Sequence, residues 1–140
     1  MNREQLLQLI PHAGRMCLLD RVIAHSDRDI ECTTGTHRDP GHALRRDGQL
    51  AALHLTEYAA QAMAAHGALL AGGNAQPGML AALRDIRLHT DRIDTIDADL
   101  TVHAVRRLAQ RDGSLYDFNV RAGERLLCEG RIAIAFGVLL

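Results

Sequence analysis

The stretch from residue 51 to residue 71 most constrains the fold of this chain, because it is built mostly of alanine, leucine and methionine. As a helix it would be apolar on nearly every face, which is typical of a helix buried in protein. Its only carboxylate, Glu57, lies between His54 and Gln61. A run of about 20 apolar residues can also cross a bilayer, but these polar side chains would be costly there. We therefore expect a central helix that protein buries on all sides.

The rest of the chain divides into short segments with helix-like or strand-like patterns. Residues 3–9 predict a short helix that is closed by Pro11. Two segments rich in apolar and β-branched residues flank the break at residues 26–28 and predict a hairpin; they are 17–25 and 29–36. Four more strands are expected after the long helix, over residues 79–89, 98–108, 114–122 and 126–136.

The last two strand-like segments alternate between apolar and polar residues. Tyr116, Phe118 and Val120 alternate with Asp117 and Asn119, and the final segment repeats this pattern. Period-two alternation with glycine-bearing turns between the segments indicates antiparallel meander pairing.

The predicted order is a helix, two strands, one dominant helix and about four strands. Helices that flank a parallel sheet would alternate with strands, and here they do not. The order fits an α+β architecture called the hot-dog fold, in which an antiparallel β-sheet wraps around one long central helix. The length of 140 residues fits one domain over residues 1–140. Its open sheet edge would make it a dimer by sheet extension.

Composition excludes several classes of function. All basic residues are arginine, which removes Schiff-base lysines and phosphate-binding P-loops. A net charge of −1 and 3% aromatic residues argue against nucleic-acid binding. The three cysteines are scattered and show no CxxC motif, as in a protein with reduced thiols. The first residues lack the long apolar core of a signal peptide, so we expect a cytoplasmic protein that does not associate with membranes.

Glu57 is the strongest candidate for chemistry. A buried glutamate is rare unless it is paired, and burial would raise its pKa so that it could donate a proton. His54, Glu57 and Gln61 share one helix face, which would form the wall of a site. Alternatively, Glu57 lies on a solvated seam or pairs with Arg84 or Arg87. The HxxE spacing could be half of a metal site, but no second ligand cluster matches it, so we expect no metal.

The polar loop before the helix, residues 37–49, offers two histidines that could face Glu57. Either His37 or His42 could act as a general base, because the pKa of histidine lies near working pH. Backbone N–H groups at the start of the helix could polarise a substrate carbonyl. His12 could line the mouth of the site or simply precede the first strand. The alternative for each histidine is an ordinary structural position.

Two blocks of the sequence resemble the 3-hydroxyacyl-[acyl-carrier-protein] dehydratases of the hot-dog superfamily. LIPHAGRMCLLDRVI, residues 9–23, is similar to that family's N-terminal signature. GHALRRDGQLAALHLTEYAAQAM, residues 41–63, resembles its catalytic loop and helix. The EYAAQAM helix is closest to dehydratase-like proteins of aryl-polyene and related pigment clusters.

The resemblance implies dehydration of a 3-hydroxyacyl thioester to the trans-2-enoyl thioester, in fatty-acid or polyene-type synthesis, without a cofactor. His42 would remove the α-proton and Glu57 would protonate the leaving hydroxyl, with Gln61 holding Glu57. The family's His-Phe-Pro-Gly reads His-Ala-Leu-Arg here, which leaves His37 or His12 as an alternative base.

The resemblance also implies partners. The acyl chain would arrive on the phosphopantetheine arm of an acyl carrier protein, and the chain would form a homodimer or a heterodimer with a related dehydratase. Two other functions stay open: an acyl-thioester hydrolase, in which Glu57 activates water, and a catalytically weak partner subunit of an active dehydratase.

Overall fold

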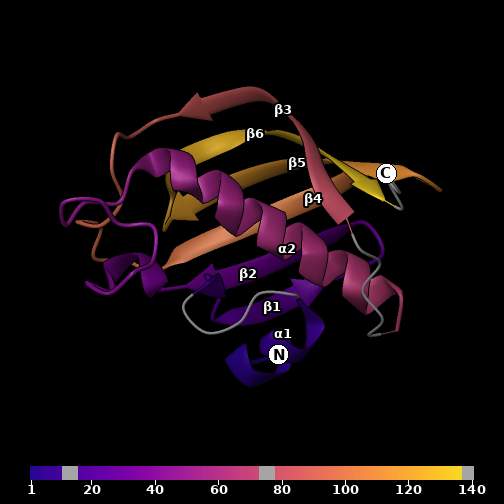
Figure 1. The fold of residues 1–140 in the computed structure, drawn as a ribbon, viewed down its shortest axis with the longest axis horizontal. Helices are drawn as coiled ribbons and strands as arrows, with labels where there is room; N and C mark the ends of the chain where they lie inside the picture. The colour runs from indigo at the N-terminus through magenta and orange to yellow at the C-terminus, as the bar shows by residue number, and fades with distance from the viewer. Residues whose placement is uncertain (11–15, 73–77, 137–140) are drawn as a thin grey trace.

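A six-stranded antiparallel sheet with one long helix across its face organises the protein (Figure 1). The computed structural model describes residues 1–10, 16–72 and 78–136. The strand order in the sheet is β1-β2-β4-β5-β6-β3. In chain order the elements are α1 (Arg3–Leu9), β1 (Arg21–His25), β2 (Asp29–Thr34), the 3-10 turns η2 (Thr36–Arg38) and η3 (Ala52–His54), α2 (Leu55–Leu70), β3 (Gly78–Leu88), β4 (Leu100–Gln110), β5 (Gly113–Ala122) and β6 (Arg125–Phe136).

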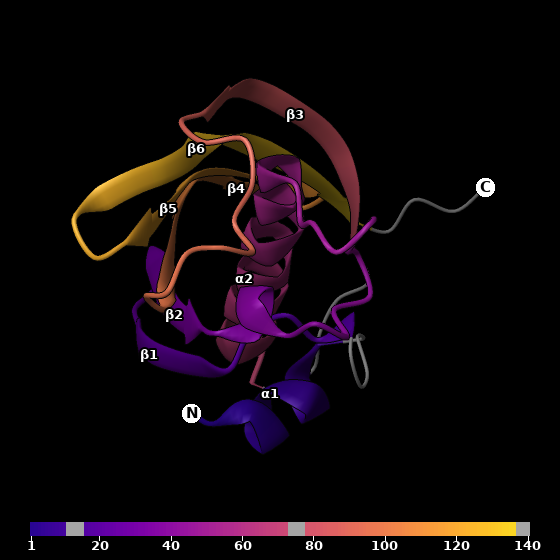
Figure 2. The same cartoon turned by 90° about the vertical axis from the view of Figure 1, so that its left-hand side faces the viewer.

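The hot-dog arrangement expected from the sequence is confirmed. Seen along α2, the sheet curves around the helix (Figure 2), and α2 packs chiefly on β4, β2 and β5. The buried core between them is aliphatic and rich in alanine, with Ala59, Ala62 and Ala65 of α2 fully covered. None of the described helices is long and apolar enough to cross a membrane.

One face of α2 is left uncovered, so the prediction of burial on all sides is wrong for a single chain. Leu53, in the turn just before α2, is 53% exposed, and Ala60 and Ala64 are only partly buried. Glu57 is also exposed. The physical reason is that the sheet covers only one side of the helix. The apolar composition of the helix does not reveal which of its sides will stay open.

The N-terminal hairpin forms as predicted, but its first strand is shorter. Ser26 N–H donates to the carbonyl of Asp29 at 2.9 Å and closes the turn between β1 and β2. Residues 17–20 were expected in the strand, yet β1 begins at Arg21. Leu18 is buried without a strand partner, because its N–H donates to the side chain of Gln61 at 2.8 Å instead.

The meander prediction holds for β4, β5 and β6, which pair consecutively and antiparallel. β3 departs from it: the strand pairs with β6 rather than with β4, and it forms one edge of the sheet. The pairing is interrupted between Arg84 and Arg87, where Asp85 has a positive φ of 54°. Such an irregularity bends a strand and increases its local twist.

Candidate active site

The loop that carries the predicted histidines is held against the start of α2 by its own polar contacts. His42 N–H donates to the carbonyl of Asp39 at 3.0 Å. The guanidinium of Arg45 donates to the carbonyls of His37, at 3.0 Å, and Gly48, at 2.8 Å. Arg45 therefore links the two ends of this loop through hydrogen bonds. The loop then leads directly through η3 into α2.

His42 is nearly buried, at 6% exposure, and both of its ring nitrogens are occupied. Nδ1 accepts a hydrogen bond from the N–H of Leu44 at 3.1 Å. Nε2 lies 2.9 Å from the hydroxyl of Tyr58, which comes from the first turn of α2. Burial lowers the pKa of His42, and the nearby charge of Arg45 lowers it further. The imidazole is therefore neutral at neutral pH, the state that a general base needs.

Tyr58 continues this contact into a chain of buried hydroxyl groups. Its hydroxyl lies 2.9 Å from Oγ1 of Thr36, which donates to the carbonyl of Leu18 at 2.6 Å. Burial raises the pKa of Tyr58 to about 12, so the hydroxyl keeps its proton. Neither Tyr58 nor Thr36 was predicted as a site residue. The available signal was chemical: a tyrosine in an otherwise apolar helix needs a partner for its hydroxyl.

Glu57 and Gln61 do not form the shared wall that their spacing predicts. Glu57 is exposed, whereas Gln61 is 1% exposed. The Gln61 amide accepts from the N–H of Leu18 at 2.8 Å and donates to the carbonyl of Met16 at 2.6 Å. The prediction that Gln61 holds Glu57 is therefore corrected, because both ends of its amide already bind the segment before β1.

His42 and Glu57 share no hydrogen bond within the described part of one chain. Successive helix residues point about 100° apart, so the side of α2 that brings Tyr58 to His42 turns Glu57 away from it. His54 lies at the N-cap of α2 and is half-buried. The structure thus gathers His42 with Tyr58 and leaves Glu57 on the open face of the helix.

The two alternative bases predicted from the sequence are His37 and His12. His37 is completely buried, and its Nε2 lies 2.8 Å from the carbonyl of Ile96, to which it donates. Burial lowers the pKa of His37. Its Nδ1 is buried without a hydrogen-bond partner among the described residues, whereas the contact of Nε2 with Ile96 fits a structural role. His12 lies outside the described residues.

A second histidine of α2 makes a similar buried pair farther along the helix. His66 Nδ1 lies 2.6 Å from the hydroxyl of Tyr116, and Nε2 donates to the carbonyl of Ser26 at 2.8 Å. Burial lowers the pKa of His66. This contact ties the β1–β2 turn and β5 to the far half of α2.

A family model of ApeP dehydratases, the ApeP-like family, matches residues 4–136. The chain belongs to the ApeP-like dehydratase family. It is therefore an enzyme of the hot-dog dehydratase type, as the resemblance of its loop and helix had implied. A comparison with curated proteins found no match.

Solved structures share the fold of this ApeP-like chain. The dehydratase heterocomplex ApeI:P from Xenorhabdus doucetiae matches with a TM-score of 0.81 and 22% identity, over 95% of this chain and 91% of that chain. A hypothetical thioesterase with coenzyme A from Streptococcus pneumoniae gives 0.63 and 15%, over 84% of each chain. A thioesterase from Haemophilus influenzae gives 0.63 and 20%, over 100% of this chain and 93% of that one.

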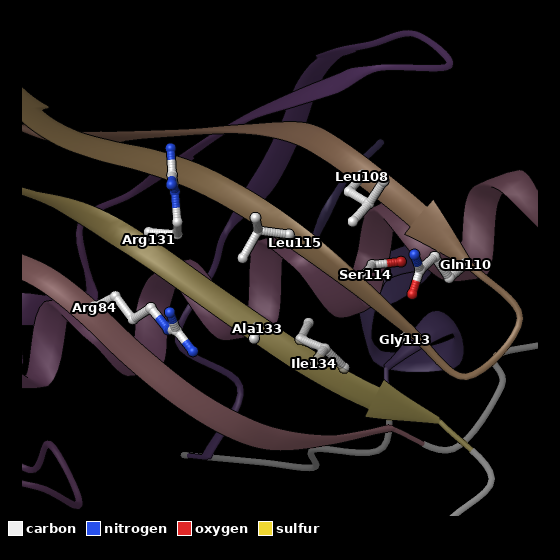
Figure 3. Close-up of a pocket in the computed structure, with 9 residues that line it drawn as sticks. All are labelled: Arg84, Leu108, Gln110, Gly113, Ser114, Leu115, Arg131, Ala133 and Ile134. Carbon is white, nitrogen blue, oxygen red and sulfur yellow. The ribbon is translucent and has the colours of Figure 1, made fainter.

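A shallow cavity of about 330 Å³ on the ApeP-like chain lies away from these residues (Figure 3). It opens on the side of the sheet opposite α2. The hydroxyl of Tyr116 contacts the helix, and the next residue along the strand, Leu115, lines the cavity, because neighbouring side chains of a strand point to opposite faces. Arg84 and Arg131 line it, and Arg131 is already paired with Asp117 at 2.8 Å. None of the predicted site residues that the structure describes contributes to it.

Proposed function

We propose that this chain dehydrates a 3-hydroxyacyl thioester, carried on the phosphopantetheine arm of an acyl carrier protein, to the trans-2-enoyl thioester. The observation that carries the proposal is a buried, neutral His42 held against the first turn of the helix that bears Glu57, in a chain of a dehydratase family. His42 takes a proton from the α-carbon, and Glu57 gives one to the β-hydroxyl, which leaves as water.

The open face of α2 supports a site completed by a second chain. Glu57 lies on this face next to the exposed Leu53, and large exposed apolar groups are typical of an interface. We propose a dimer, with a second copy or with a related dehydratase, in which Glu57 of one chain approaches a histidine of the other. The heterocomplex of the ApeI:P neighbour supports the related chain as a partner.

The carrier protein requires a docking surface near the loop of His42. Arg46 is exposed in this loop, and within the described chain it makes no ion pair. A free arginine would attract an acidic carrier protein. We expect Arg46→Glu to weaken carrier-protein binding several-fold in a titration at low salt. Arg125→Glu, at the exposed β5–β6 turn, is the control and should change little; equal affinity in both variants would remove Arg46 from the docking surface.

Two other functions each have one supporting observation. An acyl-thioester hydrolase fits the separation of Glu57 from His42, since a lone exposed carboxylate could activate water. A catalytically weak partner subunit fits the occupation of both His42 nitrogens. Their products differ: dehydration gives enoyl thioester, hydrolysis gives free thiol, and a partner subunit alone gives neither.

The test is an assay with carrier-protein-bound 3-hydroxyacyl substrates over a range of chain lengths, read by mass spectrometry. Wild type is compared with His42→Ala and Glu57→Gln, and with His89→Ala and Glu124→Gln as controls at exposed positions far along the chain. We expect enoyl product from wild type and both controls, and a large loss in both site variants. Activity that survives His42→Ala would exclude His42 as the base, and free thiol as the product would replace dehydration by hydrolysis.

A further inference from the structure

We infer that Tyr58 is a positioning residue for His42. By holding Nε2–H of the ring, Tyr58 leaves Nδ1 of His42 as the nitrogen that takes the substrate proton. This inference rests on the proposed dehydration. It names the base atom, and it names a hydroxyl chain from Tyr58 to Leu18 that holds the ring in place.

The first step is the location of the proton on the His42 ring. The N–H of Leu44 donates to Nδ1 at 3.1 Å, and a nitrogen that accepts a hydrogen bond carries no proton. In the neutral ring the proton is therefore on Nε2. Nε2 lies 2.9 Å from the hydroxyl oxygen of Tyr58, so its N–H donates to Tyr58.

The second step is the direction of the hydroxyl chain. The Tyr58 hydroxyl oxygen accepts the hydrogen bond from Nε2–H. Its own O–H therefore donates to Oγ1 of Thr36, which lies 2.9 Å away. Thr36 in turn donates to the carbonyl of Leu18 at 2.6 Å, and a carbonyl can only accept. Thr34 also donates to this carbonyl, at 2.5 Å. A backbone donor, the N–H of Leu44, at one end and a backbone acceptor, the carbonyl of Leu18, at the other thus give every hydrogen bond of the chain the same direction.

The third step is the chemistry that this order allows. The α-carbon–hydrogen bond breaks, its proton adds to the lone pair of Nδ1, and its electrons form the carbon–carbon double bond. The bond from the β-carbon to oxygen breaks, and the hydroxyl leaves as water with a proton from Glu57. The Leu44 N–H must turn away from Nδ1 to admit the substrate. Throughout, the Nε2–H group keeps its hydrogen bond to the hydroxyl of Tyr58. This bond fixes the orientation of the ring, as in other oriented bases.

Several charged or titratable groups surround His42 and would act on its titration. They are Asp39 and Arg45 of its own loop, His37 of η2, and His54 and Tyr58 at the start of α2. Tyr58→Phe removes only a hydroxyl, so the charges of the other groups are unchanged. Without its anchor, the ring can turn toward water, which relieves the burial that lowers its pKa.

The experiment compares wild type with Tyr58→Phe by nitrogen NMR of the His42 ring and by dehydration kinetics. In wild type we expect the proton on Nε2 at neutral pH. In Tyr58→Phe we expect a higher titration midpoint for His42 and a kcat lowered about 10- to 100-fold with little change in KM, since a small misplacement of a base costs up to about 100-fold.

The matched control is Tyr116→Phe, which removes the hydroxyl from the other buried histidine–tyrosine pair. It should move the titration of His66 and leave that of His42 and kcat unchanged. Thr36→Val cuts the same chain one step farther on and should lower kcat in the same direction, whereas Thr36→Ser keeps the hydroxyl and should restore it. If Tyr58→Phe does not fold, the comparison of Thr36→Val with Thr36→Ser tests the inference instead.

Two results would overturn the inference: a proton on Nδ1 of His42 in wild type, or a Tyr58→Phe protein whose His42 titration and kcat match wild type. Absence of dehydration in wild type would instead remove the proposed function. In that case the ring NMR of the same variants still decides whether Tyr58 holds His42 in the Nε2–H form.

Discussion

At the scale of single residues, both tyrosines of this chain lie against a buried histidine. Tyr58 contacts His42 and Tyr116 contacts His66, in a core that is largely aliphatic. A buried hydroxyl without a partner is destabilising, so each tyrosine requires such a neighbour. The sequence identifies both tyrosines as needing partners. It does not identify the partners, because the path of the loop that brings His42 to α2 depends on many weak contacts.

Gln61 gives a prediction at the same scale. Gln61→Leu would keep the volume of the side chain but leave the N–H of Leu18 and the carbonyl of Met16 unpaired. Because an unsatisfied buried group costs about 1–3 kcal/mol and the N–H of Leu18 is buried, we expect the free energy of unfolding in urea to fall by about 1–3 kcal/mol. Gln49→Leu, at an exposed loop position, is the control. A variant that lost activity at unchanged stability would return Gln61 to the role of holding Glu57.

His66 gives a prediction for pH. Its pKa is lowered in the folded protein, so between its ordinary value near 6.5 and the folded value the unfolded chain binds more protons. Stability from this group is thus complete above about pH 6.5 and is lost as the pH falls. We expect the free energy of unfolding of wild type to decrease from pH 7 to pH 5. In His66→Gln the slope of this decrease should be smaller, by up to about 1.4 kcal/mol per pH unit. Equal slopes would contradict it.

At the scale of elements, α2 shows what periodicity can and cannot predict. Its apolar composition predicts a long helix at residues 51–71, and the helix forms over Leu55–Leu70. Its orientation was not predictable, because alanine and leucine occupy every face and the polar residues of its one polar face divide between the open side and the core. Glu57 and Gln61 are one turn apart, yet the boundary of the packed face passes between them. The contact with the sheet, rather than the helix itself, sets that boundary.

The packing of β3 on β6 gives the element-scale prediction. Gly130 of β6 has no room for a side chain, since a Cβ there would collide with the side chain of Ile86 and lie 3.3 Å from Cε1 of Phe118. Overpacking costs about 1–3 kcal/mol, so Gly130→Ala should destabilise the protein by that amount in urea. Adding Ile86→Ala should relieve part of the collision, giving a combined loss smaller than the sum of the two. Strict additivity would show that the two positions do not touch.

At the scale of the whole molecule, the single chain leaves one side of its central helix and two sheet edges open. β1 and β3 are these edges, and each presents an exposed large apolar residue, Ile23 and Leu83. The β1 edge is partly covered, because the N-terminus exchanges backbone hydrogen bonds with Val22. The order of elements was enough to predict the hot-dog architecture, because a helix this apolar needs a sheet to wrap it. The same sequence could not show what covers the open face, since that depends on a second chain.

If the sheet extends through β3, a charge on that edge should separate the dimer, while the same charge on β1 should not. A lysine on an edge strand opposes pairing with another strand. Leu83 is 40% exposed and Ile23 is 46% exposed, so Leu83→Lys and Ile23→Lys disturb the single chain to a similar extent. We expect light scattering to give a dimer mass for wild type and Ile23→Lys, alone or mixed with a related dehydratase chain, and a monomer mass for Leu83→Lys. The opposite pattern would place the interface on β1.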